Sequence, residues 1–406
     1  MESGTAAPRR PLAPGGPQAR DTRLPPDVEA LSGPRRLRRI ALVSAMVALI
    51  PAAVSYLDTI VQPSNSSLGI RSVEWLRDHG ARGLVSKVES IYYQLTAPAK
   101  GGAALRALPQ VGFGGGAHGA GARAKALPLG AAAPAAYRPR RVAALIHPAL
   151  AGEGVWRSAR RAEPGGPVLV TTLRNQPEYP RVVAGLAWID ATRTTVTLYP
   201  GRQEPAVSMN RGPLEVPQRR RGRLLATFNS AFKLSDSGGG FALNGHTYAP
   251  LRDGAATLVG YSDGRVDVVA WHSGAAAPRW VTFARQNLPL IVNGGHVNPQ
   301  LNDSAEWGAT LGNAVLVWRS AIGVDRRGNL IFAAANNQTV RSLASTLLRA
   351  GAIRAMELDV NSYWVNFITY GAPGAQHPVN LLPDMVRSAS RYLEPDDRDF
   401  FAVYAR

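Results

Sequence analysis

Apolar and charged positions are unevenly distributed along this 406-residue chain. The clearest apolar stretch is Ile40–Leu57, which contains no charged side chain and lies between the basic cluster Arg35–Arg39 and Asp58. A helix of about 18 residues at about 1.5 Å each spans about 27 Å, the thickness of a thin hydrocarbon core. The pattern therefore predicts a transmembrane helix at 38–58, in which Pro51 is tolerated.

The charges that flank this helix predict its orientation. Lys and Arg are enriched on the cytoplasmic side of membrane helices, so the basic cluster predicts a cytoplasmic N-terminus and an extracytoplasmic main domain. The chain is thus expected to be a single-pass protein of the cell membrane with an uncleaved signal anchor. A signal peptide cleaved near Ala52–Val54 is the competing interpretation, but the long arginine-containing segment before the helix is unusual for a signal peptide.

Short runs rich in β-branched and aromatic residues dominate the chain after about residue 141. The segments 181–190 (RVVAGLAWID) and 194–200 (TTVTLYP) predict two neighbouring strands. Turn-forming pairs between apolar runs predict further hairpins, at Asn244-Gly245, Asp253-Gly254, Asp263-Gly264 and Gly328-Asn329.

One segment has the spacing of an amphipathic helix. Apolar residues recur at i, i+3, i+4, i+7 and i+8 from Val340 to Leu348, and Gly351 is suited to the position just past the helix end. The run 352–360 (AIRAMELDV) follows as a buried strand. Many hairpins with few helices indicate an α+β fold, with a mixed, hairpin-rich sheet and a few packed helices.

Composition divides the chain into five parts. Residues 1–37 are rich in Pro, Gly, Ala and Arg, and we expect a disordered cytoplasmic tail, followed by the membrane helix. Residues 59–97 are expected to be a juxtamembrane helical segment, which either packs on the main domain or rests on the membrane. Residues 98–140 are a Gly/Ala/Pro-rich linker, and 141–406 form the catalytic or binding domain.

Charge and composition exclude several classes of function. The chain has 46 basic and 28 acidic side chains, a formal net charge of +18, and no cysteine. The absence of cysteine excludes disulfides, thiolate metal sites and a cysteine nucleophile. The basic residues form short separate groups without interleaved aromatics, so we expect no nucleic-acid partner. An anionic substrate or an anionic envelope surface accounts for the charge equally well.

Polar-rich loops that follow apolar runs contain the candidate site residues. Together with the entrance to one hairpin, these loops supply Asn229, Ser230, Asn293, His296, Arg319, Ser320, Glu357, Asp359 and Asn361. Structural roles compete with functional ones, because an asparagine can cap a turn, Asn-Gly-Gly is a common tight turn, and a loop histidine is often only solvated. The seven histidines lack metal-site spacing, so no metal site is predicted.

Glu357 and Asp359 are the most informative pair. Residues i and i+2 of a strand face the same side, so the two carboxyl groups repel each other and one pKa can rise, as acid–base catalysis requires. The alternative is that Glu357 pairs with a nearby arginine and only Asp359 reaches the site.

The order of the motifs resembles that of the phosphodiester glycosidase family. LYPGRQEP, TFNSAF, WRSAIGVDRRGNLIF and VRSLASTLLRAGAIRAMELD occur in that order within about residues 181–370. The family shows N-G-x-F where this chain has Asn229–Phe232, and R-T-A-I-G where it has Arg319–Gly323. A glycine run follows the family's aspartate, whereas Val360 and Asn361 follow Asp359 here. The resemblance is to bacterial, membrane-anchored members.

The resemblance implies a hydrolase that cleaves a sugar-1-phosphodiester in envelope glycans or exopolysaccharide. Asp359 would be the carboxylate catalyst, Glu357 its partner and His296 a proton donor. Arg319 would bind the phosphate, and the substrate would also be held by Asn229, Ser230, Asn293, Ser320 and Asn361. No cofactor is predicted, and a divalent cation is left open. The expected partners are an anionic glycan or sugar phosphate and the lipid bilayer.

A second class of function fits the same sequence. The chain would then be a non-catalytic envelope protein that binds glycan or assists cell-wall or exopolysaccharide assembly.

Overall fold

The computed structural model describes residues 33–406, with the exception of 82, 86, 89–90, 92–94, 96–97, 104, 110–136, 161–162, 164, 303–304 and 309–314. The chain divides into two compact units, Met1–Thr59 and Ile60–Arg406. The tail predicted at 1–37 lies outside the described residues up to residue 32, and so does the part of the predicted linker from 110 to 136.

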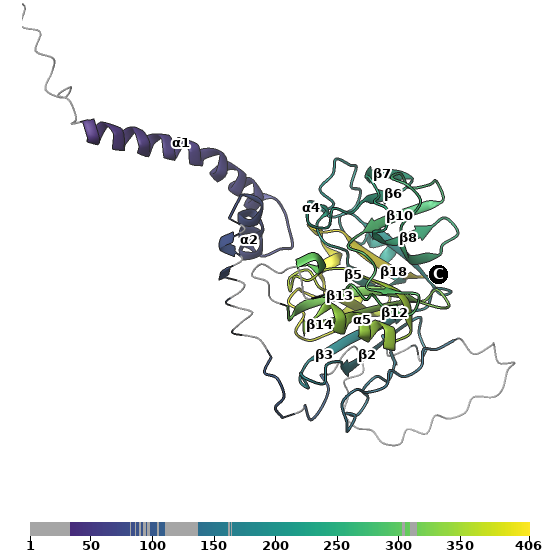
Figure 1. Ribbon diagram of the computed structural model, residues 1–406. Coiled ribbons are helices and arrows are strands. Elements are labelled where there is room, and N and C mark those ends of the chain that lie inside the picture. The colour runs from purple at the N-terminus through teal and green to yellow at the C-terminus, as the bar shows by residue number, and fades with distance from the viewer. Residues whose placement is uncertain are drawn as a thin grey trace, which may run out of the picture. The chain divides into compact units, whose positions relative to one another are not determined.

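Helix α1 (Gly33–Val61) accounts for the described part of the first unit and ends two residues into the second (Figure 1). It contains the helix predicted at 38–58, and Pro51 lies inside it. Proline removes one backbone hydrogen bond, which a long helix tolerates in a membrane. By length and composition, Pro34–Val61 can cross a membrane, and a signal sequence near an N-terminus has the same properties.

Three sheets with antiparallel neighbours form the second unit. The largest has the strand order β1 (Arg157–Ser158), β2 (Val168–Arg174), β3 (Val183–Ile189), β14 (Leu330–Gln338), β13 (Val317–Asp325), β15 (Ala352–Glu357), β11 (Val292–Asn293) and β12 (His296–Val297). The second has the order β7 (His246–Ala249), β6 (Phe241–Leu243), β10 (Val281–Gln286), β8 (Ala256–Tyr261) and β9 (Val266–Ala270). The third has the order β17 (Gln376–Asn380), β16 (Phe367–Ala372), β5 (Leu224–Asn229), β18 (Phe400–Ala405) and β4 (Thr194–Tyr199).

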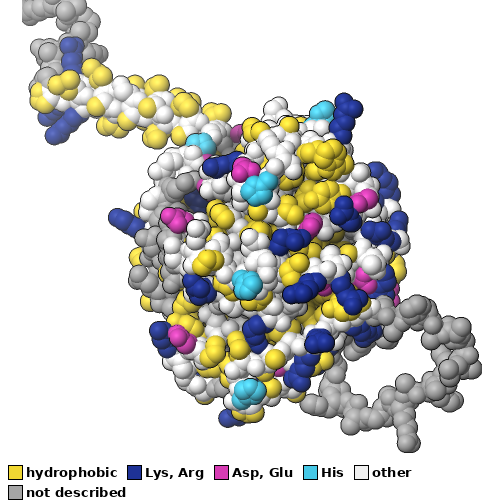
Figure 2. Space-filling model, turned by 45° about the vertical axis from the view of Figure 1, so that its right-hand side comes forward, with side chains coloured by type: hydrophobic (Ala, Val, Ile, Leu, Met, Phe, Trp, Pro, Cys, Tyr) yellow, Lys and Arg dark blue, Asp and Glu magenta, His cyan; other side chains and the backbone are white. Residues whose placement is uncertain are grey.

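Helices in the described part of this unit are few and short, which confirms the α+β class. They are α2 (Leu68–Asp78), η3 (Gln218–Arg223), α4 (Leu234–Ser237), η4 (Ala305–Trp307), α5 (Val340–Arg349) and η5 (Arg391–Leu393). On the face shown in Figure 2, basic side chains are interspersed with acidic and hydrophobic ones.

Most of the predicted hairpin turns join paired strands. Asn244 and Gly245 connect β6 to β7 with φ of 52° and 80°, the left-handed conformations that a two-residue hairpin turn needs. Gly264 lies between β8 and β9, and Gly328 between β13 and β14. Asp253-Gly254 is different, because it joins β7 to β8, which are not neighbours in the sheet. A turn pair indicates that the chain reverses, but not which strand it then joins.

Helix α5 forms where the apolar spacing predicts it. Thr339 caps its N-terminus by accepting a hydrogen bond from the Ser342 backbone N–H over 3.0 Å, and Gly351 follows the C-cap with φ of 104°. Its apolar stripe is buried in one hydrophobic cluster with residues of β13, β14 and β15. The helix therefore covers one face of the largest sheet.

The opposite face of the largest sheet packs against the third sheet through an aromatic cluster. The ring of Phe228 in β5 lies 5.7 Å from that of Phe332 in β14, 6.0 Å from Phe367 and 5.1 Å from Phe401, measured between centroids. All four are buried, and such ring pairs contribute beyond the area they bury. This packing places the end of β5 next to β13 and β15.

We predict that Leu343→Ala lowers the free energy of unfolding by about 2–5 kcal/mol, because it leaves a cavity between α5 and the sheet. Leu348→Ala, on the half-buried side of the same helix, should cost about half as much. Urea unfolding of both variants measures the difference. Equal losses would contradict the packing described for α5.

Candidate active site

Three segments that are distant in sequence meet at Ser320 in β13. The Ser320 hydroxyl oxygen lies 3.1 Å from the Asn229 amide nitrogen at the end of β5 and 3.2 Å from the backbone nitrogen of Asp359. The Ser320 backbone N–H donates to the Asp359 carbonyl over 2.9 Å, which continues the pairing of β13 with β15. All three residues are buried. The predicted segments of Asn229, Ser320 and Asp359 thus lie together.

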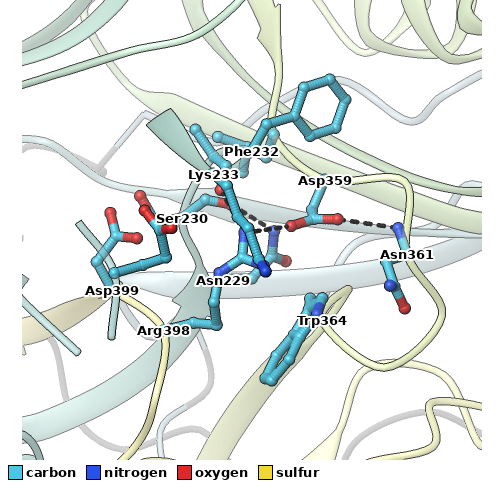
Figure 3. A network of polar contacts seen from close by, with 12 residues as sticks. Asn229, Ser230, Phe232, Lys233, Asp359, Asn361, Trp364, Arg398 and Asp399 are labelled. Atoms are coloured by element: carbon cyan, nitrogen blue, oxygen red, sulfur yellow. Dashed lines mark hydrogen bonds and ion pairs between the residues drawn. The ribbon is translucent and has the colours of Figure 1, made fainter. Parts of the chain in front are cut away.

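Asp359 is a buried carboxylate with few partners (Figure 3). Its Oδ2 lies 3.1 Å from Arg398 Nη2, and its Oδ1 accepts a hydrogen bond from the Asn361 backbone N–H over 2.9 Å. Burial raises the pKa of Asp359 to about 6, although Arg398 and the backbone N–H groups of Asn361 and Val360 oppose the rise. Near neutral pH this group can therefore exchange its proton, as a catalytic carboxyl group must.

Arg398, which the sequence analysis did not identify, is the cation of this site. It also donates from Nη2 to the Ala231 carbonyl over 3.1 Å, and its Cζ lies 5.1 Å from the centre of the Trp364 ring. Its buried Nε has no hydrogen-bond partner among the described residues. The run Asp396–Asp399, in which Arg398 stands among three aspartates just before the apolar strand β18, was the available signal in the sequence.

Arg319 and Glu357 form an internal pair instead of a substrate contact. Arg319 Nη1 lies 2.6 Å from Glu357 Oε1 and donates to the Trp307 carbonyl, while Nε donates to the Gln338 carbonyl. Burial raises the pKa of Glu357, and Arg319 opposes this rise. The structure therefore corrects the expectation that Arg319 binds phosphate and that Glu357 shares the site. It has the alternative arrangement, in which Glu357 pairs with an arginine and Asp359 reaches the site.

Asn293 and His296 lie apart from this group, which corrects their expected place in the site. Both are exposed in the β11–β12 turn, where Gly295 donates its N–H to the Ile353 carbonyl. A strand rises about 3.3 Å per residue, so six residues of β15 and its extension place Asp359 about 20 Å from Ile353. The Asn-Gly-Gly segment is the tight turn that its sequence also allowed.

Ser230 and Asn361 remain beside Asp359. The buried Ser230 hydroxyl has no hydrogen-bond partner in the described part of the chain, and the Asn229 amide group donates to the Ser230 carbonyl over 2.8 Å. Asn361 accepts from the Tyr363 backbone N–H, which closes a turn after Asp359. Ser230 therefore offers a free hydroxyl in the site, whereas Asn361 mainly shapes the loop.

The valine that replaces the family's glycine does not strain the backbone. Val360 has no positive φ, and its side chain is buried in an apolar cluster with Phe232 and Val317. Only a left-handed backbone would favour glycine here. The departure from the glycine run therefore changes the wall of the site and not the position of Asp359.

A second cation, Lys233, lies in the loop that follows Asn229 and Ser230 and stands directly before α4. Its Nζ lies 2.8 Å from Glu74 Oε2 and 3.2 Å from Asp78 Oδ1, both in α2. Among the residues that the structure describes, no group of three or more His, Asp or Glu side chains is placed to hold a metal ion.

Comparison with known proteins agrees with the motif order. Residues 222–359, which contain Asn229, Ser320 and Asp359, match the family model described as phosphodiester glycosidase. No curated protein matches the chain as a sequence relative.

Among solved structures, the chain is similar to a hypothetical protein from Synechocystis (14% identity, TM-score 0.34, 55% of this chain and 59% of that one). It thus spans less than two thirds of that protein. It is also similar to the catalytic domain of zebrafish N-acetylglucosamine-1-phosphodiester alpha-N-acetylglucosaminidase (15% identity, TM-score 0.38, 62% and 87%). A third is a putative exported protein from Burkholderia pseudomallei (11% identity, TM-score 0.27, 57% and 75%).

The family model covers the end of β5, the whole of β13 and the extension of β15, the three elements that position Asp359. On this match, residues 222–359 are similar to the phosphodiester glycosidase family, whose members are hydrolases.

Proposed function

We propose that this chain is a membrane-anchored, extracytoplasmic hydrolase that cleaves the bond between the anomeric carbon of a sugar and a phosphodiester. The observation that carries the proposal is Asp359, whose backbone is bonded to Ser320 and whose buried carboxyl group is held by Asn361 and Arg398. It lies inside the segment that matches the family. Arg398 takes the role first expected of Arg319, because its Nε remains available to a substrate oxygen.

The chemistry needs only one carboxylate beside the anomeric carbon. Glycosidases use such a group to attack that carbon or to take a proton from an attacking water. Breaking the bond between the anomeric carbon and the phosphate oxygen releases a phosphate monoester, a stable anion that needs little help from a general acid. A guanidinium that donates to the phosphate oxygens stabilises the charge that develops on them. Asp359 and Arg398 can supply both functions.

The membrane anchor and the envelope substrate rest on helix α1. Its basic residues precede its apolar stretch, the arrangement of an anchor with a cytoplasmic N-terminus. The domain would then act outside the cytoplasmic membrane, where glycans and exopolysaccharide with sugar phosphodiesters are its substrates. The net charge of +18 favours such anionic polymers.

We predict that Asp359→Asn lowers kcat/KM for a sugar-1-phosphodiester by at least about 100-fold, because the amide group cannot act as base or nucleophile. The full chain in detergent is assayed against a panel of sugar-1-phosphodiesters, with Asp253→Asn, an exposed acid paired with His272, as the control. Retained turnover in Asp359→Asn would reject the assignment. Glycan binding without turnover in the unmodified chain would favour the non-catalytic envelope protein.

The pH dependence of turnover is a second test. Because burial raises the pKa of Asp359 to about 6, the catalytic carboxylate is lost as the pH falls below that value. We expect kcat/KM to rise as the pH increases through about 6 and to fall about tenfold per pH unit below it. A profile that instead declines through this range would identify Asp359 as a general acid.

Glu357→Gln should affect stability more than catalysis. The substitution leaves the buried Arg319 guanidinium without its counterion, which typically costs about 3–5 kcal/mol. We expect kcat/KM to stay within about fivefold of the unmodified chain at a temperature where the variant is folded, and Glu357→Gln/Arg319→Met to recover part of the stability. Urea unfolding and turnover measure the two effects, and a loss of turnover at full stability would return Glu357 to the catalytic machinery.

A further inference from the structure

Helix α2 lies against the domain with a largely polar face. Its buried residues are Ile70, Arg71 and Glu74, so charged side chains outnumber apolar ones on the face that it buries. Ser67 caps the helix, which is 11 residues long. A helix of this length is marginally stable alone and depends on the contacts that it makes. Contacts of this polar kind are typical of surfaces that separate and rejoin, unlike a hydrophobic core.

Glu74 is the centre of these contacts. Its two carboxylate oxygens lie 2.8 Å from Lys233 Nζ and 2.7 Å from Arg77 Nη1. The side chains of Glu74 and Lys233 are only 12% and 14% exposed. Burial raises the pKa of Glu74, but Lys233 and Arg77 outweigh it and the pKa is lowered. Glu74 is therefore a largely buried anion that contacts two cations, Lys233 and Arg77.

The side chain of Lys233 extends toward the candidate catalytic carboxyl group (Figure 3). Figure 3 shows its side chain directed toward the region of Arg398 and Asp359. The charge of Arg398 acts to lower the pKa of Lys233. The charge of Glu74 acts to raise the pKa values of Arg398 and Asp359. Arg398 thus contacts Asp359, and one carboxylate of α2 contacts Lys233 and is within electrostatic range of Arg398 and Asp359.

We propose that Lys233, together with Arg398, forms the phosphate subsite of the active site, and that Glu74 of α2 occupies this subsite as an internal anion that the substrate phosphate displaces. The inference rests on the proposed function, since it is the sugar phosphodiester that brings the phosphate. A carboxylate and a phosphate both spread negative charge over adjacent acceptor oxygens, so the ammonium and guanidinium groups that hold one can hold the other.

A second set of contacts keeps α2 close to the subsite. Arg387 Nη2 lies 2.6 Å from the Asn65 side-chain oxygen, its Nη1 lies 3.2 Å from the Ser66 hydroxyl, and the Asn65 amide group donates to the Arg391 carbonyl. These bonds are independent of Glu74, so they remain when α2 moves. A tethered carboxylate competes at a high effective concentration, and the substrate must overcome it.

Glu74→Gln tests the proposal, because it removes the internal charge and keeps the size of the side chain. The affinity of the full chain in detergent for inorganic phosphate is measured by calorimetry. We expect phosphate to bind at least about tenfold more tightly to Glu74→Gln than to the unmodified chain, a typical size for coupling between competing groups. Glu178→Gln, which removes an exposed carboxylate 3.7 Å from Lys100, is the matched control and should leave the affinity unchanged.

Lys233→Met in the Glu74→Gln background tests whether the gain in phosphate affinity arises at the subsite. The gain in phosphate affinity should vanish in this double variant, and thermal unfolding establishes that each variant is folded. Equal phosphate affinity in Glu74→Gln and the unmodified chain would overturn the inference, as would a gain that survives Lys233→Met.

Turnover of sugar-1-phosphodiesters, measured on the same samples, separates the inference from the proposed function. Tighter phosphate binding in Glu74→Gln without turnover in any sample would support the subsite and reject the hydrolase. Turnover with no change in phosphate affinity would support the hydrolase and reject the subsite.

Discussion

Pairing of buried arginines with carboxylates is the constraint on which the catalytic end of this domain depends. Arg285 lies 2.7 Å from Asp399, Arg319 lies 2.6 Å from Glu357 and Arg391 lies 2.7 Å from Asp396, and every one of these side chains is buried. Removing a charge from water costs free energy, so a buried arginine and a buried carboxylate must stay in contact with each other. The first pair joins the end of β10 to the segment before β18, the second joins β13 to β15, and the third joins η5 to the segment before β18.

Asp359 differs from Asp396 in how its carboxylate is paired. Arg391 contacts both oxygens of Asp396, and burial is outweighed there, so that the pKa of Asp396 is lowered. Asp359 instead shares Arg398 with the Ala231 carbonyl, and burial prevails. Asp396, which an arginine contacts at both oxygens, is therefore held as an anion, whereas the pKa of Asp359, which has one arginine contact, is raised to about 6.

The sequence predicted the elements whose cause is local. Helix α5 follows from its apolar spacing and from Thr339 and Gly351 at its ends, and the hairpin at Asn244-Gly245 follows from turn chemistry. The meeting of Asn229, Ser320 and Asp359 could be expected because all three stand at the ends or in the interior of apolar strands within one ordered set of motifs. Backbone pairing between strands positions these residues, and the apolar pattern of the sequence predicts those strands.

The partners of the charged residues could not be predicted in the same way. Arg319 and Arg398 are both arginines next to apolar runs, and only the packing of β13 on β15 assigns the first to Glu357. Asn293 and His296 follow an apolar run as Asp359 does, but they leave their sheet at the opposite end of β15. Lys233 meets Glu74 across about 160 positions of chain, which no local pattern encodes.

The hydrogen bonds from Arg387 to Asn65 and Ser66 determine what is lost when the chain is shortened from its N-terminus. Burial lowers the pKa of Arg387 to about 10, because the charged guanidinium is less stable there than in water. In the three-residue strap Ser64–Ser66, Asn65 and Ser66 supply acceptor oxygens to Arg387, and the Ser64 hydroxyl donates a hydrogen bond to Asp397. A shortened chain that starts beyond Ser67 would lose these ligands together with the helix that precedes them. The compact unit that contains the three sheets accordingly begins at Ile60, upstream of the strap and far before the first strand of the largest sheet.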